Sequence, residues 1–187
     1  TNLTQLNLNG NEISDLSPLS RAQNLSSLSM IGNKINNLAP LSGLTNLQTL
    51  LLSTNEISDI SPLSSLIKLN ELDLSFNKIE NVNPLSQLKN LTILEMPYNQ
   101  ISNISGISQL TGLQLLLIYN NQISDISPLS NLKDLYVISA GDNRITDISP
   151  LNKVNFPNLY QLIVDNQQNS LPDQTITLGA VSKIDNP

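Results

Sequence analysis

The side chains with the most obvious chemical potential are three carboxylates, Glu71, Asp73 and Glu95, which alternate along two short predicted strands. Paired carboxylates can act as general acid and base or can bind calcium. We expect these three on an open face with nothing to desolvate them, and no loop has the spacing of a calcium site. The chain has no cysteine and no histidine, which excludes Cys/His zinc sites, cysteine nucleophiles and Ser-His-Asp triads. The sequence therefore predicts no enzyme, no metal site and no cofactor.

The overall charge narrows the class of partner. Nine Lys and Arg residues stand against fifteen Asp and Glu, for a net charge of −6, and the basic residues form no cluster. A nucleic-acid backbone and an anionic membrane surface are therefore not expected partners. No run of about 18 apolar residues is present, so we expect no membrane insertion. The absence of cysteine fits an intracellular protein and a secreted bacterial protein equally well.

A repeat organises the whole chain. One asparagine, followed two residues later by isoleucine, recurs at a constant step of 22: Asn11, Asn33, Asn55, Asn77, Asn99, Asn121 and Asn143. The consensus LxxLxLxxNxIxxIxPLxxLxx is typical of a leucine-rich-repeat solenoid. The repeats begin at Leu3, Leu25, Leu47, Leu69, Leu91, Leu113, Leu135 and Leu159, and two extra residues in segment 151–158 make the last step 24. We predict a right-handed α/β solenoid with a parallel β-sheet on the concave face and short 3₁₀ turns on the convex face.

Each part of the repeat has a predicted role. The LxxLxL segment alternates as a short strand does, and Leu116 and Ile118 are its inward pair in the sixth copy. The asparagine amide both donates and accepts, so stacked copies can satisfy backbone groups of neighbouring turns. Ser127 is predicted to cap a short helical turn with Pro128 at its first position.

The domain boundaries follow from the same register. Residues 1–166 are predicted to form the repeat domain, with seven full repeats and a partial eighth, and we expect its N-terminal cap to be missing from the sequence. Because Thr1–Leu3 repeats the junction sequence of Thr45–Leu47, we expect the chain to be a piece of something longer. Gln167 stands where the next asparagine is due, and residues 174–178 alternate like an edge strand. Residues 167–187 are therefore predicted to be a C-terminal cap or the start of an adjoining domain.

The variable positions of the strand segment predict the binding site. Written LabLcLdeN, the segment has five outward positions, and equivalent positions form columns across the sheet. All four tyrosines and one of two phenylalanines fall in these columns, although aromatics make up only 3% of the chain. We predict a partner-binding site at Phe76, Ile93, Glu95, Tyr98, Leu115, Leu117, Tyr119, Tyr136, Val137, Tyr160 and Ile163. The alternative is that strands simply favour aromatic and branched residues, although the first two repeats use mainly Ser, Thr, Asn and Gln.

The repeat sequences are more specific than the general leucine-rich-repeat consensus. The segments NQISDISPLSNLKDL, NEISDISPLSSLIKL and NEISDLSPLS resemble the 22-residue repeats of the internalin family of Gram-positive bacterial surface proteins. The resemblance covers about residues 3–164, and LPDQTITLGAVSKIDNP is similar to the opening of the Ig-like region of that family. Three departures, Gly106 for proline and Ala22 and Ala140 for leucine, are expected to weaken packing locally.

The resemblance implies a function. Internalins are secreted or anchored to the cell wall, and characterised members bind host proteins through the concave strand face. We therefore expect an extracellular, monomeric protein-binding module, on the bacterial surface or secreted, that recognises a host cell-surface receptor in adhesion, invasion or virulence. Two alternatives stay open: an intracellular regulatory subunit of a protein phosphatase, which shares the 22-residue period, and a passive spacer.

Overall fold

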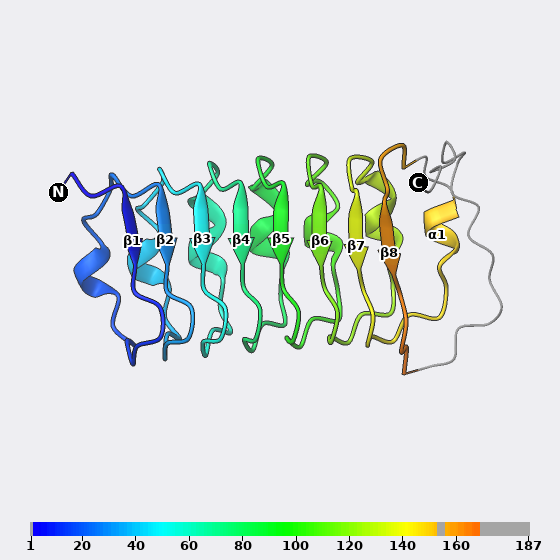
Figure 1. The fold of residues 1–187 in the computed structure, drawn as a ribbon, viewed down its shortest axis with the longest axis horizontal. Helices are drawn as coiled ribbons and strands as arrows, with labels where there is room; N and C mark the ends of the chain where they lie inside the picture. Colours follow the sequence, from blue (N-terminus) through cyan, green and yellow to red (C-terminus); the bar gives the residue numbers. More distant parts are fainter. Residues whose placement is uncertain (1, 153–155, 169–187) are drawn as a thin grey trace, which may run out of the picture.

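A single parallel sheet runs the length of the molecule. The computed structural model describes residues 2–152 and 156–168. Its strands are β1 (Gln5–Asn7), β2 (Ser27–Ser29), β3 (Thr49–Leu51), β4 (Glu71–Asp73), β5 (Ile93–Glu95), β6 (Leu115–Leu117), β7 (Val137–Ser139) and β8 (Gln161–Ile163). They pair in sequence order and all in parallel (Figure 1). Each pairs with its neighbour 22 residues on, except for the step of 24 between β7 and β8. The predicted solenoid is confirmed.

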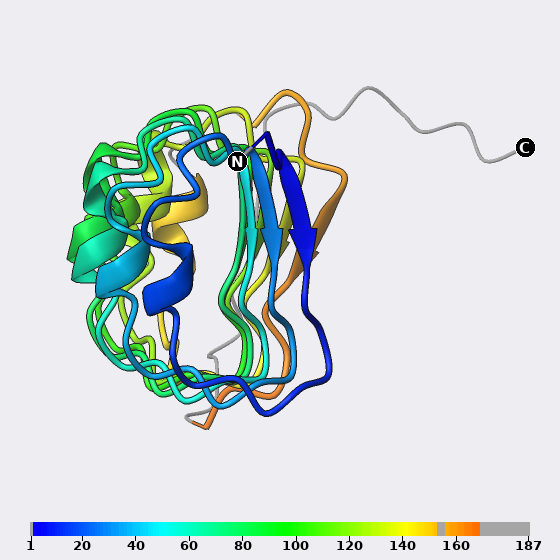
Figure 2. The same cartoon turned by 90° about the vertical axis from the view of Figure 1, so that its left-hand side faces the viewer.

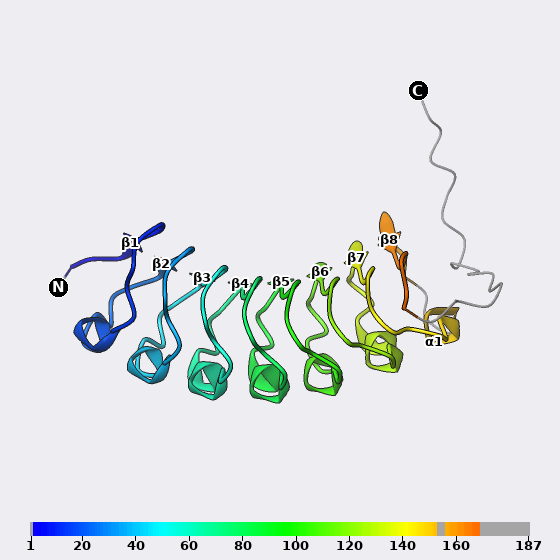
Figure 3. The same ribbon diagram turned by 90° about the horizontal axis from the view of Figure 1, so that it is seen from below.

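Short helical turns form the second layer. These are η1 (Ser17–Leu19), η2 (Ala39–Leu41), η3 (Ser61–Ser65), η4 (Asn83–Gln87), η5 (Ser105–Ile107), η6 (Ser127–Asn131) and α1 (Ser149–Asn152). The first six are 3₁₀ turns, as predicted, and the seventh is α-helical. Seen end-on, the sheet and the turns form opposite sides of the repeat (Figure 2), and the strands follow the inner side of a gentle arc (Figure 3). No helix within the described ranges has the length and apolar character needed to cross a membrane.

The hydrophobic core is a continuous column between these layers. The central residue of every strand from β2 to β7 is fully buried, as at Leu72, Leu94 and Leu116, and so is Ile118. Phe156, the one aromatic residue outside the five columns, is buried where earlier repeats have a leucine such as Leu132. Phe156 precedes Leu159 by three residues, as Leu132 precedes Leu135, so the spacing of the repeat is regular again from Phe156 onward.

The repeated asparagines form a buried hydrogen-bond ladder, as predicted. Asn77 is typical: its Nδ2 donates to the carbonyls of Leu52 and Leu74 at 3.1 Å each, and its Oδ1 accepts from the backbone N–H of Ile57 at 2.9 Å. Every buried side-chain polar atom among the described residues has a partner. Gln167 continues the ladder, because its Oε1 accepts from the Ile145 N–H at 2.9 Å.

The predicted serine cap of the convex turn is wrong. Ser127 is the first residue of η6, and no side chain caps that turn from the preceding residue, Ile126. Instead Asp125 accepts the Ser127 N–H at its Oδ1 (2.8 Å) and the Ser127 hydroxyl at its Oδ2 (2.9 Å). Asp and Asn readily close such turns onto the backbone two residues ahead. The same geometry holds at Asp15, Asp59 and Asp147, and the amides of Asn37, Asn81 and Asn103 accept the equivalent N–H.

The glycine of the fifth repeat has a packing role that the sequence did not suggest. Gly106 is buried, and a β-carbon on it would stand 2.6 Å from the Val82 carbonyl oxygen. A parallel β-bridge joins Asn81 to Asn103 in the same two repeats. The expectation that Gly106 weakens packing is therefore corrected, because the absence of a side chain lets the convex parts of these repeats approach each other closely.

The predicted C-terminal region lies mostly beyond the described part of the chain. Residues 169–187, including the predicted strand at 174–178, are outside it. The boundary proposed between 1–166 and 167–187 stays a prediction.

Candidate functional site

The concave face, by which we mean the five outward columns a to e, is built by the strands and the turn that follows them. The register places Glu95 opposite Leu117, and Ile93 opposite Leu115, in the next strand. Val137 adjoins Leu115 in turn, so Ile93, Leu115 and Val137 form one row across three strands. These side chains are half-buried between their neighbours. The predicted apolar residues of the middle repeats are therefore adjacent in the structure.

One column is less outward than predicted. At position d, Ser75, Pro97 and Gly141 are buried, because the chain turns there toward the asparagine ladder. Tyr119 occupies the same column and is half-buried. Its larger ring extends back over the neighbouring repeat, where it meets another aromatic side chain.

Three aromatic residues form one contiguous group, which we call the aromatic cluster: Phe76, Tyr98 and Tyr119. The rings of Phe76 and Tyr98 stack with centroids 4.2 Å apart and an interplanar angle of 11°. Tyr119 meets Tyr98 edge-on, at 5.6 Å and 84°. Phe76 is 48% exposed and Tyr98 is 43% exposed, so a large ring surface faces solvent. Exposed stacked aromatics of this kind are typical anchors of protein interfaces.

Column e places its residues in the left-handed backbone region. Glycine, Asn or Asp, which tolerate positive φ, fill most of the column: Gly10, Gly32, Asn120, Asp142 and Asn166. Phe76 (φ 52°), Tyr98 (φ 54°) and Thr54 (φ 57°) are the exceptions. Bulky L-residues pay a steric cost there, and strained residues tend to gather at functional sites. The preference for Gly, Asn and Asp in column e is visible in the sequence and indicates positive φ there, although the predicted site did not rest on it.

The carboxylates lie beside this cluster. Asp73 and Glu95 are direct partners in adjacent strands, with Glu71 on the same face. Partial burial raises the pKa of Glu95, and the neighbouring charges of Asp73 and Glu71 raise it further. Burial also raises the pKa of Tyr119, with smaller added effects from Tyr98, Glu95 and Asp73. The expectation that nothing desolvates these carboxylates is thus wrong for Glu95.

The remaining predicted residues are more scattered. Tyr136 and Tyr160 are 45% and 71% exposed in column a, and within the described ranges neither makes a ring contact with the cluster. Ile163 is half-buried on β8 opposite Ser139. Ring contacts among the predicted residues are therefore confined to repeats four to six in the described part of the chain, and the apolar row extends to Val137 of repeat seven.

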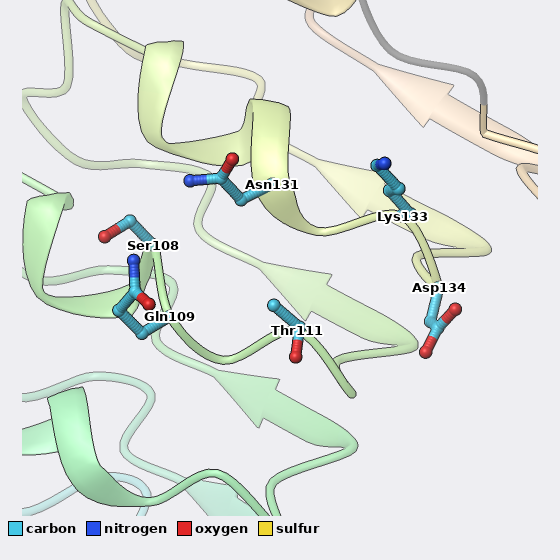
Figure 4. Close-up of a pocket in the computed structure, with 6 residues that line it drawn as sticks. All are labelled: Ser108, Gln109, Thr111, Asn131, Lys133 and Asp134. Atoms are coloured by element: carbon cyan, nitrogen blue, oxygen red, sulfur yellow. The ribbon is translucent and has the colours of Figure 1, made fainter.

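A shallow polar depression lies elsewhere, on the loops that lead from the helical turns into the strands. Its lining residues come from two successive repeats: Ser108, Gln109, Thr111, Asn131, Lys133 and Asp134 (Figure 4). It holds neither an aromatic side chain nor a group of carboxylates. Across the part of the chain that the structure covers, no three acidic residues converge closely enough to hold a metal ion. The concave face is therefore the better candidate site.

Comparison with known proteins agrees with the repeat fold. The family model for leucine-rich repeats in two copies matches residues 45–87, 89–131 and 111–153. No protein with a curated description matches the chain significantly in sequence.

Solved structures give a narrower family. Internalin C2 from Listeria monocytogenes is 37% identical with a TM-score of 0.84, over 88% of this chain and 72% of that one. Internalin F from the same species is 32% identical with a TM-score of 0.83, over 90% of this chain and half of that one. The ectodomain of the Arabidopsis thaliana receptor kinase GASSHO1/SCHENGEN3, in complex with Casparian strip integrity factor 2, is 25% identical with a TM-score of 0.74, over 88% of this chain and 21% of that one. The protein described here belongs to the internalin family of leucine-rich-repeat proteins.

Proposed function

We propose that this chain is the protein-binding module of a secreted or wall-anchored bacterial surface protein, and that its concave face binds a host surface protein during adhesion or invasion. The observation that carries the proposal is the aromatic cluster. Phe76 and Tyr98 expose stacked rings from a backbone conformation that glycine or asparagine would adopt with less strain. The fold needs no aromatic residue there, so a contact outside the chain accounts best for the two rings.

The surroundings of the cluster have the composition of an interface. Half-buried aliphatic side chains at Ile93, Leu115 and Leu117 adjoin it, and carboxylates form a polar rim. Large aromatic residues at the centre with polar residues at the edge are typical of protein-binding surfaces. The similarity to internalins C2 and F supports this function over that of an intracellular phosphatase regulator.

The test is a triple substitution of Tyr98, Tyr119 and Tyr136 by serine. Binding of fluorescently labelled protein to host cells, measured by flow cytometry, should weaken by at least about 30-fold, since the loss of one interface anchor costs about 2 kcal/mol. The melting temperature should stay close to that of the wild type, because none of the three rings belongs to the core.

A matched control uses the same face in the first repeats. Serine at Gln5, Asn7 and Gln48 shortens three exposed concave side chains of repeats one and three, none of them part of the aromatic cluster, and should leave cell binding unchanged. If the tyrosine variant binds as the wild type does, the concave face is not the binding site, and the spacer function becomes the better explanation.

A further inference from the structure

The charge of the protein is concentrated on its concave face. The five outward columns carry five carboxylates and no lysine or arginine: Glu71, Asp73, Glu95, Asp142 and Asp165. The rest of the chain has ten acidic against nine basic residues and is nearly neutral. This face therefore accounts for most of the net charge of −6, and its field favours a cationic partner.

The carboxylates are most crowded beside the aromatic cluster. Asp73 and Glu95 face each other across adjacent strands, which lie about 4.8 Å apart. Like charges directly opposite each other in a sheet are destabilising. Among the described residues, no ion pair involves Glu71, Asp73 or Glu95.

The two salt bridges among the described residues lie outside the five columns. Lys34 pairs with Glu12 at 3.3 Å and Lys78 pairs with Glu56 at 3.2 Å, both at the position that follows the ladder asparagine. Within residues 2–152 and 156–168, no cation of the chain pairs with Asp73 or Glu95 to offset their repulsion. A cation supplied by a partner would relieve it.

The aromatic cluster adds a second preference for a cation. The ring face of Phe76 or Tyr98 attracts a positive group by cation–π interaction. An arginine guanidinium is planar, so it can stack on a ring and also form paired hydrogen bonds to a carboxylate. A lysine ammonium can also make a cation–π contact, but it lacks the planar group that forms paired hydrogen bonds to a carboxylate.

We propose that the protein partner docks an arginine-bearing basic segment on this face, with a guanidinium stacked on the Phe76–Tyr98 pair and hydrogen-bonded to Asp73 and Glu95. This inference rests on the proposed protein-binding function and adds the chemistry of the partner. It assigns Asp73 and Glu95 to recognition and leaves Asp142 and Asp165 as distant contributors to the field.

The test uses a defined probe: a capped glycine peptide with two arginines, compared with the same peptide carrying neutral citrulline. In NMR titrations of ¹⁵N-labelled protein, the arginine peptide should shift the amide signals of Phe76, Glu95 and Tyr98. Its dissociation constant should rise by about fivefold in the double variant Asp73→Asn and Glu95→Gln, which corresponds to about 1 kcal/mol. The citrulline peptide should shift none of these signals.

The matched control removes the same charge from the same face. Asp142→Asn with Asp165→Asn should change the dissociation constant by less than about twofold, because these groups stand two and three repeats beyond Glu95. At about 4.8 Å per strand this is roughly 10 and 14 Å, more than the Debye length of about 8 Å at physiological salt. Equal binding of the citrulline peptide, or an equal loss in both double variants, would overturn the proposal. In the host-cell assay, loss of binding in the tyrosine variant with full binding of the Asp73 and Glu95 variant would uphold partner binding and overturn only the basic chemistry.

Discussion

The rings of Phe76 and Tyr98 stack 4.2 Å apart although both backbones are left-handed, with φ of 52° and 54°. Left-handed backbone costs an L-residue about 1–2 kcal/mol, and an aromatic pair returns about 0.5–1.5 kcal/mol. Because both residues are left-handed, the pair costs about 2–4 kcal/mol in all and its stacking offsets only part of this, so the pair contributes no net stability. Thr54 has the same left-handed backbone (φ 57°) but no aromatic partner, so substitutions at Thr54 measure the cost of the backbone strain without the gain from stacking.

Substitution of Thr54 by asparagine should therefore stabilise the protein by about 0.5–1 kcal/mol, since asparagine tolerates positive φ. Phe76→Asn and Tyr98→Asn should each change stability by less than about 1 kcal/mol, because relief of strain is offset by loss of stacking. Urea unfolding followed by circular dichroism measures all three. A lower midpoint for Thr54→Asn would show that the strain is not significant.

Gly106 offers a second comparison with a matched control. Alanine at Gly106 should lower the free energy of unfolding by about 1–3 kcal/mol, because its β-carbon would meet backbone atoms of Val82 and Asn83 at 2.6–2.8 Å. Alanine at Gly43, which has nothing within 4 Å, should be neutral or slightly stabilising. Proline at Gly106 would restore the repeat consensus, but it should also destabilise the protein because proline has the same β-carbon as alanine. Equal midpoints for the two alanine variants would contradict the close approach.

The repeat made most of the fold predictable. A constant step of 22 dictates the register of every strand pair from β1 to β7, and the buried asparagines follow from their amide chemistry. Gly106 was misjudged because the deviation from proline is visible in the sequence, whereas the backbone approach that requires it is a tertiary contact. Ser127 was misjudged because two polar residues, Asp125 and Ser127, could each have capped the turn, and only the geometry distinguishes them.

The candidate site was predictable only in part. Column positions correctly brought Ile93 and Leu115 together, because in-register strands align equivalent residues. They did not distinguish Tyr98, which stacks within the cluster, from Tyr160, which stands apart and exposed. Ring contacts depend on side-chain rotamers and on the direction of the chain after the strand, and neither follows from periodicity.

The asparagine ladder should contribute measurably to stability. Asn77→Ala leaves the buried Ile57 N–H without its partner, at a cost of about 1–3 kcal/mol. The Leu52 and Leu74 carbonyls keep the amides of Asn55 and Asn99, so they remain hydrogen-bonded. Asn11→Ala at the equivalent but exposed position of the first repeat should cost less than about 1 kcal/mol, because water replaces its bonds. Thermal unfolding of the two variants side by side measures the difference, and similar melting temperatures would refute the ladder as a source of stability.

The convex turns should depend on aspartate more than on serine. Asp59→Ala should cost about 1 kcal/mol at neutral pH, and Ser61→Ala should cost less, because Asp59 accepts both the N–H and the hydroxyl of Ser61. These bonds lower the pKa of Asp59 below its usual 3.8, so its contribution is present above pH 3.8 and is lost as the pH falls through the lower, folded-state value. Urea unfolding at pH 7 and at pH 2.5 tests both points. An equal cost of Asp59→Ala at the two pH values would contradict the role of the charged carboxylate.

Glu95 should show the opposite dependence on pH. Burial and the charges of Asp73 and Glu71 raise its pKa above the usual 4.5, so the folded state holds the proton more tightly than the unfolded state does. Below pH 4.5 the carboxyl is protonated in both states and costs nothing; as the pH rises through the folded-state pKa, stability is lost. Glu95→Gln should therefore raise the urea midpoint at pH 7 and leave it nearly unchanged at pH 3.5. The same substitution should weaken binding of the arginine peptide. A Glu95→Gln variant that is more stable but binds less well would show that this carboxylate destabilises the fold and serves recognition. A variant that is less stable at pH 7 would show instead that Glu95 supports the fold.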